Sequence, residues 1–409
     1  MDECFTLTNG RIVLPGEVLE RGSVSIRDGR IVHIGPTPAV CATRFDLDGA
    51  WLFPGFIDLH SDAIEMEIQP RPNCTLPMGI AIREIERKLI SAGVTTIYHA
   101  LSLSHAPKAR QTRNTGVIER LAETLLEYRR SEQGLIRHRI HLRFEISNTA
   151  ALASVHRMLD NRAVELLSFM DHTPGQGQFH SIEHYRSYLQ EHHGFDAAAV
   201  SRYLTEIQER DKTAYDSLTI LAQRARRQGI PLASHDDDSC DKLDLIAQWR
   251  GVISEFPISL PVAKRARELG LSVIVGAPNL INGGSTGGNL SAVEAIQQGA
   301  ANILCSDYYP PALMHAVFYL YRLGYPMQDA VRLVTLQPAQ TMGVDDAIGS
   351  IAIGREADLL AVHDRGDVPH LEQVWVQGRR VSLVPVMRHS SAVGGETPGS
   401  RGKSRRQPL

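Results

Sequence analysis

The stretch PGFIDLHSD, residues 54–62, carries the pattern that decides the fold. Its apolar run ends in His60 and Asp62, which stand two positions apart. Residues i and i+2 of a β-strand lie on the same face, so both side chains are expected to project together from a strand end. Histidine and aspartate both bind divalent metal ions. The pair alone is a weak signal, because a surface charge beside a hydrogen-bonded histidine looks the same, and the interpretation needs partners elsewhere.

The region that follows alternates short apolar runs with helical patterns. The candidate strands are 55–60, 94–100, 139–146, 165–171, 231–235, 252–256, 272–276 and 302–306. Eight strands separated by helices or longer excursions are typical of a (β/α)8 barrel. Two of the helical patterns stop at Gly93 and Gly229, which are glycine stop signals. Residues 176–230 are too long for a loop and are predicted to form a helical excursion over the barrel mouth.

Short strand-like runs also lie at both ends of the chain. Asn9-Gly10 and Asp28-Gly29 are turn signals, and the second predicts a hairpin in SVSIRDGRIVHIG. We therefore predict an α/β fold: a TIM-like (β/α)8 barrel with a small β-sandwich domain formed by both termini. The predicted domains are 1–50 plus 350–385 for the sandwich, 51–349 for the barrel and 386–409 for a disordered basic tail.

Composition excludes several classes of function. A net charge of −3 gives no global attraction to nucleic acid. No run of about 18 apolar residues is present, so no membrane partner is expected, and the N-terminus shows no secretory pattern. The cysteines are scattered, odd in number and never in a C-x-x-C pair, which predicts reduced thiols in a cytoplasmic protein. They are Cys4, Cys41, Cys74, Cys240 and Cys305.

Metal-type side chains follow five of the candidate strands. Beyond His60 and Asp62, they are Glu145, His172, His235 and Asp307. Barrel enzymes assemble their sites at the C-terminal strand ends, where these residues would meet. Carboxylates and imidazoles without sulfur favour divalent ions such as Zn, Mn or Fe, and so many ligands indicate two ions. We predict that Glu145 bridges the ions and that Asp307 orients a water and accepts its proton.

Two further motifs point to an anionic substrate. PNLINGGSTGGNLS, residues 278–291, follows the seventh strand, where backbone N–H groups often hold phosphate, although a plain tight turn is the alternative. The candidate phosphate-binding residues there are Asn279, Gly284, Ser285 and Asn289. Arg71 on the stiff Pro-Arg-Pro loop suits an anionic oxygen, against a surface arginine as the alternative. His99 ends the second strand and either supports the ligands or faces the substrate.

These motifs together resemble a known family. PGFIDLHSD and GSIAIGREADLLAV resemble the amidohydrolase superfamily over nearly the whole chain. Within it, PRP, MDHTPGQ (170–176), SHDD, GAPN and SDYYPPAL (306–313) are similar to the PhnM-type ribose 1-methylphosphonate 5-triphosphate diphosphatases of the carbon–phosphorus lyase pathway. The resemblance implies a divalent metal site in a cytoplasmic enzyme. It also implies a small phosphorylated ribose phosphonate as substrate, hydrolysed by water attack at the α-phosphorus to the 5-phosphate and pyrophosphate.

Two places depart from the family pattern. Glu67 stands where relatives commonly carry histidine, and Thr286-Gly287 stand where a polar, often His-Ser-like pair is expected. A paralogue acting on another phosphorylated sugar or nucleotide therefore stays open. So do another amidohydrolase cleaving an amide, cyclic imide or amino-purine, and a non-catalytic barrel that serves as an assembly subunit. Barrels with a β appendage often dimerise, so a homodimer is a further expectation.

Overall fold

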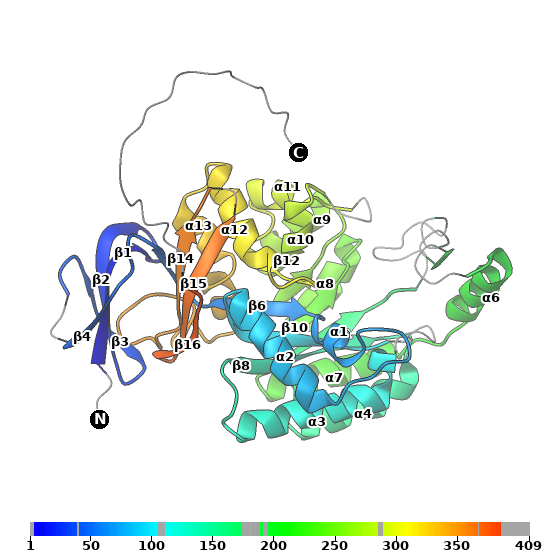
Figure 1. Cartoon of the computed structure of the whole chain (residues 1–409). Coiled ribbons are helices and arrows are strands. Elements are labelled where there is room, and N and C mark those ends of the chain that lie inside the picture. Colours follow the sequence, from blue (N-terminus) through cyan, green and yellow to red (C-terminus); the bar gives the residue numbers. More distant parts are fainter. Residues whose placement is uncertain are drawn as a thin grey trace, which may run out of the picture.

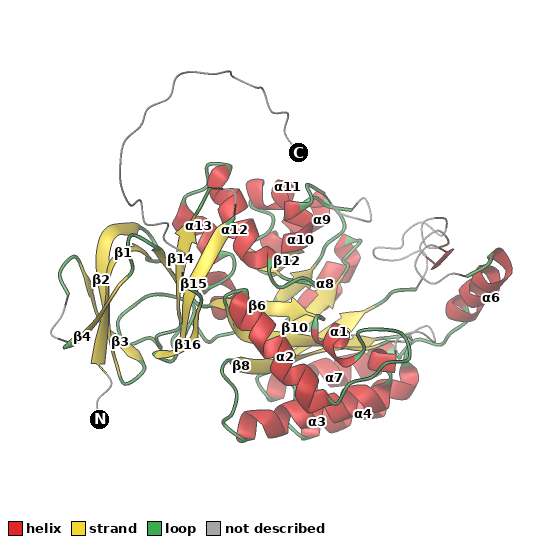
Figure 2. Cartoon of the chain, viewed as in Figure 1, coloured by secondary structure: helices red, strands yellow, loops and turns green. Residues whose placement is uncertain are grey.

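The computed structural model describes residues 4–38, 41–104, 111–173, 183, 186, 189–190, 195–284, 289–366 and 368–385. Its strands fall into two sheets, one surrounded by helices and one built from the two ends of the chain (Figures 1 and 2).

The helix-covered sheet consists of eight parallel strands in consecutive order, from β6 to β13. The strands are β6 (Phe56–Ser61), β7 (Val94–Leu103), β8 (Arg137–Glu145), β9 (Leu166–Met170), β10 (Leu232–His235), β11 (Ile253–Glu255), β12 (Ser272–Gly276) and β13 (Ile303–Cys305). Each overlaps one of the strands expected from the sequence. The first and last strands meet where the Asp307 N–H donates to the His60 carbonyl at 3.0 Å and the Asp62 N–H donates to the Asp307 carbonyl at 2.9 Å. The (β/α)8 expectation is therefore confirmed as a nearly closed barrel.

Alternation along each strand divides the barrel core into two layers. Ile57 and Leu59 of β6 belong to an interior cluster that also contains Tyr98 of β7. Phe56 belongs instead to the larger cluster between the strands and the helices. Both faces are apolar, as expected for parallel strands that are covered on each side.

The helices surround the barrel (Figure 2). They are α1 (Ile64–Ile68), α2 (Met78–Ser91), α3 (Thr115–Arg130), α4 (Leu152–Asp160), α6 (Ala197–Gln208), α7 (Tyr215–Arg227), α8 (Cys240–Gln248), α9 (Leu260–Glu268), α10 (Ala277–Ile281), α11 (Ala292–Gln297), α12 (Ala312–Arg322), α13 (Met327–Arg332) and α14 (Leu336–Thr341). The glycine stop signals are confirmed, because Gly93 after α2 and Gly229 after α7 have φ of +84° and +72°.

The excursion at 176–230 contains the helices α6 and α7 among its described residues. Figure 1 shows α6 set apart from the helices that cover the barrel. Val200 and Leu204 of α6 pack with Leu189 in an apolar cluster of their own. Most of the segment before α6 lies outside the described residues, so its predicted place over the mouth stays a prediction.

The second sheet contains β1 (Cys4–Val13), β2 (Val18–Arg27), β3 (Arg30–Gly35), β4 (Thr43–Asp46), β5 (Trp51–Pro54), β14 (Leu359–Asp364), β15 (Pro369–Val376) and β16 (Arg379–Leu383). The hairpin at Asp28-Gly29 is confirmed, with φ of +49° and +77° at the two turn residues. The turn expected at Asn9-Gly10 is wrong. Both residues lie inside β1, where Asn9 has φ of +57° and the pairing register shifts, so the signal marks a bulge.

One prediction about the cysteines is also wrong. Cys4 and Cys41 form a disulfide that ties the start of β1 to the segment before β4. The sequence does not reveal the pair because 37 positions separate the two residues, and only the folded sheet brings them together. Cys74, Cys240 and Cys305 are free thiols.

The barrel and the terminal sheet are joined by a partly buried ion-pair network. The Arg137 guanidinium at the start of β8 contacts the carboxylates of Asp358 and Glu356, which precede β14.

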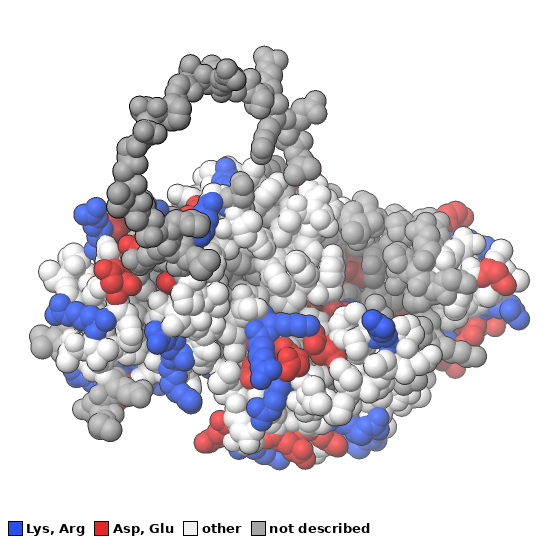
Figure 3. Space-filling view, viewed as in Figure 1, with Lys and Arg blue, Asp and Glu red and all other residues white. Residues whose placement is uncertain are grey.

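Figure 3 shows acidic and basic side chains interspersed on the viewed face. None of the described helices has the length and apolar character that crossing a bilayer requires.

Candidate metal centre

The structure gathers the predicted ligands at one end of the barrel. The ring centroids of His60 and His235 are 5.5 Å apart, and those of His172 and His235 are also 5.5 Å apart. Glu145 at the end of β8 places Oε2 2.7 Å from His172 Nδ1. These residues come from four strands, and the parallel order of the barrel brings their C-terminal ends together. Their assignment as metal ligands remains a prediction.

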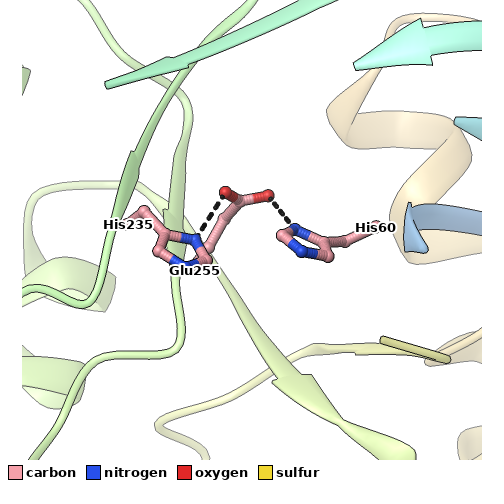
Figure 4. A group of neighbouring side chains, drawn as sticks. All are labelled: His60, His235 and Glu255. Carbon is pink, nitrogen blue, oxygen red and sulfur yellow. Dashed lines mark hydrogen bonds and ion pairs between the residues drawn. The ribbon is translucent and has the colours of Figure 1, made fainter. Parts of the chain in front are cut away.

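Glu255 is a site residue that the sequence interpretation missed. It ends β11, is fully buried and lies between two histidines (Figure 4). Its Oε1 is 3.0 Å from His60 Nδ1 and its Oε2 is 3.2 Å from His235 Nδ1. Burial lowers the pKa of both imidazoles well below the usual range, and the charge of Arg143 adds to this shift. Both rings are therefore neutral, and each carries a single N–H.

Arg143 fixes which nitrogen of His235 carries that hydrogen. Its Nη2, which can only donate, lies 2.8 Å from His235 Nε2. Nε2 must then hold a lone pair, and Nδ1 donates to Glu255. His60 donates from Nδ1 to the other carboxylate oxygen in the same way. Each Nε2 lone pair thus faces away from Glu255, which is how carboxylates orient histidines that bind metal. Inspection of the C-terminal end of the sixth strand, as was done for the other strands, would have identified Glu255.

Asp236 is a second residue that was missed. It follows His235 directly, in the SHDDD run, with a left-handed φ of +51°. Its Oδ2 lies 3.4 Å from His172 Nε2 and 3.7 Å from His235 Nε2. This oxygen is buried and accepts no hydrogen bond. The backbone conformation aims the carboxylate between the two rings, and no periodicity in the sequence signals this.

The donor set fits a divalent ion. Ligand atoms of His172, His235 and Asp236 all lie within 4.8 Å of one another, and the buried Asp236 Oδ2, which accepts no hydrogen bond, faces both rings. His60, His235 and Glu255 form a second group of the same size. His235 belongs to both groups, so the number of ions stays a prediction.

Glu145 contacts the site through His172. Its carboxylate accepts from the His172 backbone N–H at 3.2 Å as well as facing the ring. Burial disfavours the charged ring, but the carboxylates of Glu145 and Asp236 outweigh it and raise the pKa of His172 to about 9. In this arrangement Glu145 orients an imidazole, and its predicted bridging role remains untested.

Asp307 and Asp62 complete the strand-end group. Burial, and then the charge of Asp62, raise the pKa of Asp307 to about 7, while Arg143 opposes the shift. A carboxyl group with a pKa near neutrality is suited to accept a proton at physiological pH. Asp62 Oδ2 accepts from Arg113 Nη2 at 3.2 Å, and the same guanidinium binds Glu65 through Nε at 3.0 Å.

The predicted phosphate loop is only partly described. The Asn279 side chain is engaged by backbone, because Nδ2 donates to the Leu290 carbonyl at 3.1 Å and Oδ1 accepts from the Ala292 N–H at 3.1 Å. Asn279 therefore shapes the loop. Gly284 and Asn289 flank its tip and are half-buried, whereas Ser285, Thr286 and Gly287 lie outside the described residues.

The other substrate candidates have different surroundings. Arg71 is exposed in a tight turn with Cys74. The His99 ring faces the helix layer, where Nε2 lies 2.8 Å from His138 Nδ1, so it is not carried into the proposed substrate site. Glu67, the family departure, pairs with Lys88 Nζ of α2 at 2.5 Å. Its charge is thereby compensated by a neighbouring helix.

Comparison with known proteins identifies the family of the chain. The amidohydrolase family model matches residues 178–388. The alpha-D-ribose 1-methylphosphonate 5-triphosphate diphosphatase of Escherichia coli strain K12 is 32% identical over 379 residues, covering 92% of this chain and 99% of that protein. An imidazolonepropionase of Pseudomonas aeruginosa is 24% identical over 387 residues, covering 82% of this chain and 86% of that protein.

Solved structures support the fold. The N-acetylglucosamine-6-phosphate deacetylase from Pasteurella multocida superposes with a TM-score of 0.60 at 12% identity, covering 92% of this chain and 99% of that one. A Xaa-Pro dipeptidase with bound methionine superposes with a TM-score of 0.64 at 14% identity, over 92% of this chain and 99% of that one.

Proposed function

The chain belongs to the amidohydrolase family, and from this premise we propose that it hydrolyses alpha-D-ribose 1-methylphosphonate 5-triphosphate, or a close analogue, to the 5-phosphate and pyrophosphate. The observation that carries the proposal is the 32% identity with the E. coli diphosphatase, which spans 99% of that protein. The strand-end cluster of histidines and carboxylates supports it, because hydrolysis of a phosphoric anhydride mainly needs positioning and charge stabilisation.

Each described residue has a defined part in this proposal. Bound divalent ions would supply Lewis acidity and a water of lowered pKa. Glu255 holds the Nε2 lone pairs of His60 and His235 in place, and Glu145 orients the His172 ring through its Nδ1. Asp307 takes the proton of the attacking water, since the pKa of its carboxyl group is raised to about 7.

The outer phosphates are assigned to Arg71 and to the loop around Gly284, Ser285 and Asn289. An exposed guanidinium on a proline-flanked turn suits an anionic oxygen. The pairing of Glu67 with Lys88 supports this placement, because it removes the unpaired negative charge that the sequence suggested near a polyphosphate. The proposal also includes a cytoplasmic location, a homodimer and two metal ions. It divides the chain into a terminal domain of residues 1–50 plus 350–385, a barrel domain of residues 51–349 and a disordered tail at 386–409.

Position-specific isotope labelling tests the reaction. Purified protein, loaded with Mn²⁺ or Zn²⁺, is incubated in H₂¹⁸O with the ribose phosphonate triphosphate and, separately, with nucleoside triphosphates. Attack at the α-phosphorus puts ¹⁸O into the 5-phosphate and releases unlabelled pyrophosphate. Label in pyrophosphate, or release of inorganic phosphate alone, would contradict the proposal. D307N should lower kcat by about 10²–10⁴-fold, as expected for loss of a general base.

A second candidate is cleavage of a C–N bond. The observation in its favour is the imidazolonepropionase relative, which aligns over 86% of its own length. A panel of N-acyl and cyclic imide substrates, assayed for released amine or acid, separates the two reactions. Amine release without pyrophosphate release from any triphosphate would favour this second candidate. Absence of bound metal under every loading condition would favour a non-catalytic role.

A further inference from the structure

Arg143 brings a permanent positive charge to the centre of the site. On β8, Leu142 and Phe144 pack in the cluster between strands and helices. Alternation therefore turns Arg143, like Glu145, toward the barrel interior. The Arg143 side chain reaches the C-terminal end of β10, where it contacts His235, and the residue is 7% exposed.

Arg143 makes no direct ion pair among the described residues, although its charge acts at longer range on the buried carboxyl groups of Glu255 and Asp307. Among the described residues, no carboxylate oxygen lies within 4.0 Å of its guanidinium, and its one hydrogen bond goes to neutral His235. Its Nε is buried without any partner. Arg137, six positions earlier on the same strand, shows the usual solution, because it is paired with Asp358 and Glu356. A buried N–H of a cation that lacks an acceptor is costly, and an anion from outside the chain would supply that acceptor.

The free Nε belongs to a geometry that suits phosphate. Nε and Nη2 form one edge of the guanidinium and present two parallel N–H donors, which match two oxygens of a phosphoryl group. Nη2 is occupied by His235 Nε2 at 2.8 Å. A metal ion bound by His172, His235 and Asp236 would need the same lone pair of His235 Nε2. The guanidinium and the ion cannot share it, so an ion that binds there releases Nη2.

We propose that Arg143 binds a phosphoryl group of the substrate through its Nε–Nη2 edge, and that a divalent ion on His235 makes this edge available. The inference rests on the proposed function, since it places the phosphorylated substrate in the same site. It adds that metal and anion bind cooperatively: the ion frees a donor for the anion, and the anion compensates a charge that otherwise repels the ion.

Two binding measurements on the full chain test this, with inorganic phosphate and Mn²⁺ as probes. Calorimetry should show that Mn²⁺ strengthens phosphate binding to the native protein about tenfold or more, and that this gain is absent in R143M. R143K keeps the charge but lacks the edge, so it should recover less than half of the gain in binding free energy. Chelator competition should show Mn²⁺ binding to phosphate-free R143M unchanged or up to about tenfold tighter, because a competing cation has been removed.

Arg139 supplies a matched control. It lies on the same strand near the opposite end, pairs with Glu165 at 3.5 Å and is partly exposed, so R139M should leave both measurements unchanged. Weaker Mn²⁺ binding to R143M would show that Arg143 only supports the metal ligands and would overturn the proposal. Unchanged cooperativity in R143M would overturn it as well.

The outcome is separable from that of the proposed function. If R143M loses the metal-dependent phosphate binding while the native protein hydrolyses no triphosphate, the inference stands and the proposed reaction fails. If the native protein releases pyrophosphate and R143M retains the cooperative binding, the reaction stands and the inference fails. Thermal unfolding of R143M in chelator verifies the fold, which removal of a buried charge that makes no direct ion pair should leave intact.

Discussion

Replacing Glu255 with glutamine tests whether this carboxylate sets the metal-binding form of two histidines. The carboxylate accepts one hydrogen bond from His60 Nδ1 and one from His235 Nδ1. An amide of the same shape has only one acceptor oxygen, and its NH₂ group can only donate. One of the two rings must then accept at Nδ1 and carry its hydrogen on Nε2.

The structure identifies the ring that changes. Arg143 donates to His235 Nε2 at 2.8 Å and so excludes a hydrogen there. His60 is therefore the ring expected to lose its Nε2 lone pair in E255Q. Loss of such an orienting partner typically costs about 10–100-fold in metal affinity. At about 1.4 kcal/mol per tenfold, this corresponds to roughly 1.4–2.8 kcal/mol.

Two assays measure the effect. Chelator competition gives the affinity for Zn²⁺ or Mn²⁺, and nitrogen NMR of ¹⁵N-histidine-labelled, metal-free protein gives the tautomer of His60 directly. D237N is the matched control, because Asp237 is an equally buried carboxylate that accepts from the hydroxyls of Ser234 and Ser254 at 2.5 Å. Among the described residues, no hydrogen bond or ion pair joins it to an imidazole. D237N should therefore leave metal affinity within about threefold of the native value, well below the range for loss of an orienting carboxylate. Native-like metal affinity and an unchanged His60 tautomer in E255Q would refute the reasoning.

Three other predictions concern stability, measured by urea unfolding of the metal-free protein. Burial raises the pKa of Glu86, but hydrogen bonds outweigh it and lower the pKa below its ordinary 4.5, so E86Q should cost about 1.5–3 kcal/mol of unfolding free energy at pH 7. This loss of stability should disappear as the pH falls below 4.5, because the carboxylate is then protonated; a loss that does not change with pH would contradict this. R137M leaves buried Asp358 unpaired and should cost about 3–5 kcal/mol, whereas adding D358N should restore part of it; no recovery in the double variant would rule out the ion pair as the cause. Reducing the Cys4–Cys41 disulfide, which spans 37 positions, should cost about 3–4 kcal/mol, and reductant should leave the C4S variant unaffected.

Local pattern was sufficient to place the barrel strands and most of the ligand candidates. The end of a strand can be predicted from the position at which an apolar run stops. A parallel barrel then brings the C-terminal ends of all its strands to one side. His60, His172 and His235 could be grouped for this reason without any knowledge of the contacts between them.

The sequence pattern did not predict toward which side of the barrel wall the His99 side chain points. Parallel strands are apolar on both faces, so alternation along β7 does not reveal which face is interior. Asn9-Gly10 was misread because a positive φ serves a bulge as well as a turn, and only strand pairing distinguishes them.

The sequence by itself determined the architecture and the chemical type of the site, because strand length, period and end residues are properties of consecutive positions. Tertiary structure alone decided which residues of the site form hydrogen bonds and ion pairs with one another. The role of Glu255 depends on its hydrogen bonds to the rings of His60 and His235, and the unpartnered Nε of Arg143 is visible only once its surroundings are known. Hydrogen-bond partners and charge compensation depend on distances between residues remote in the chain, and no local pattern encodes those distances.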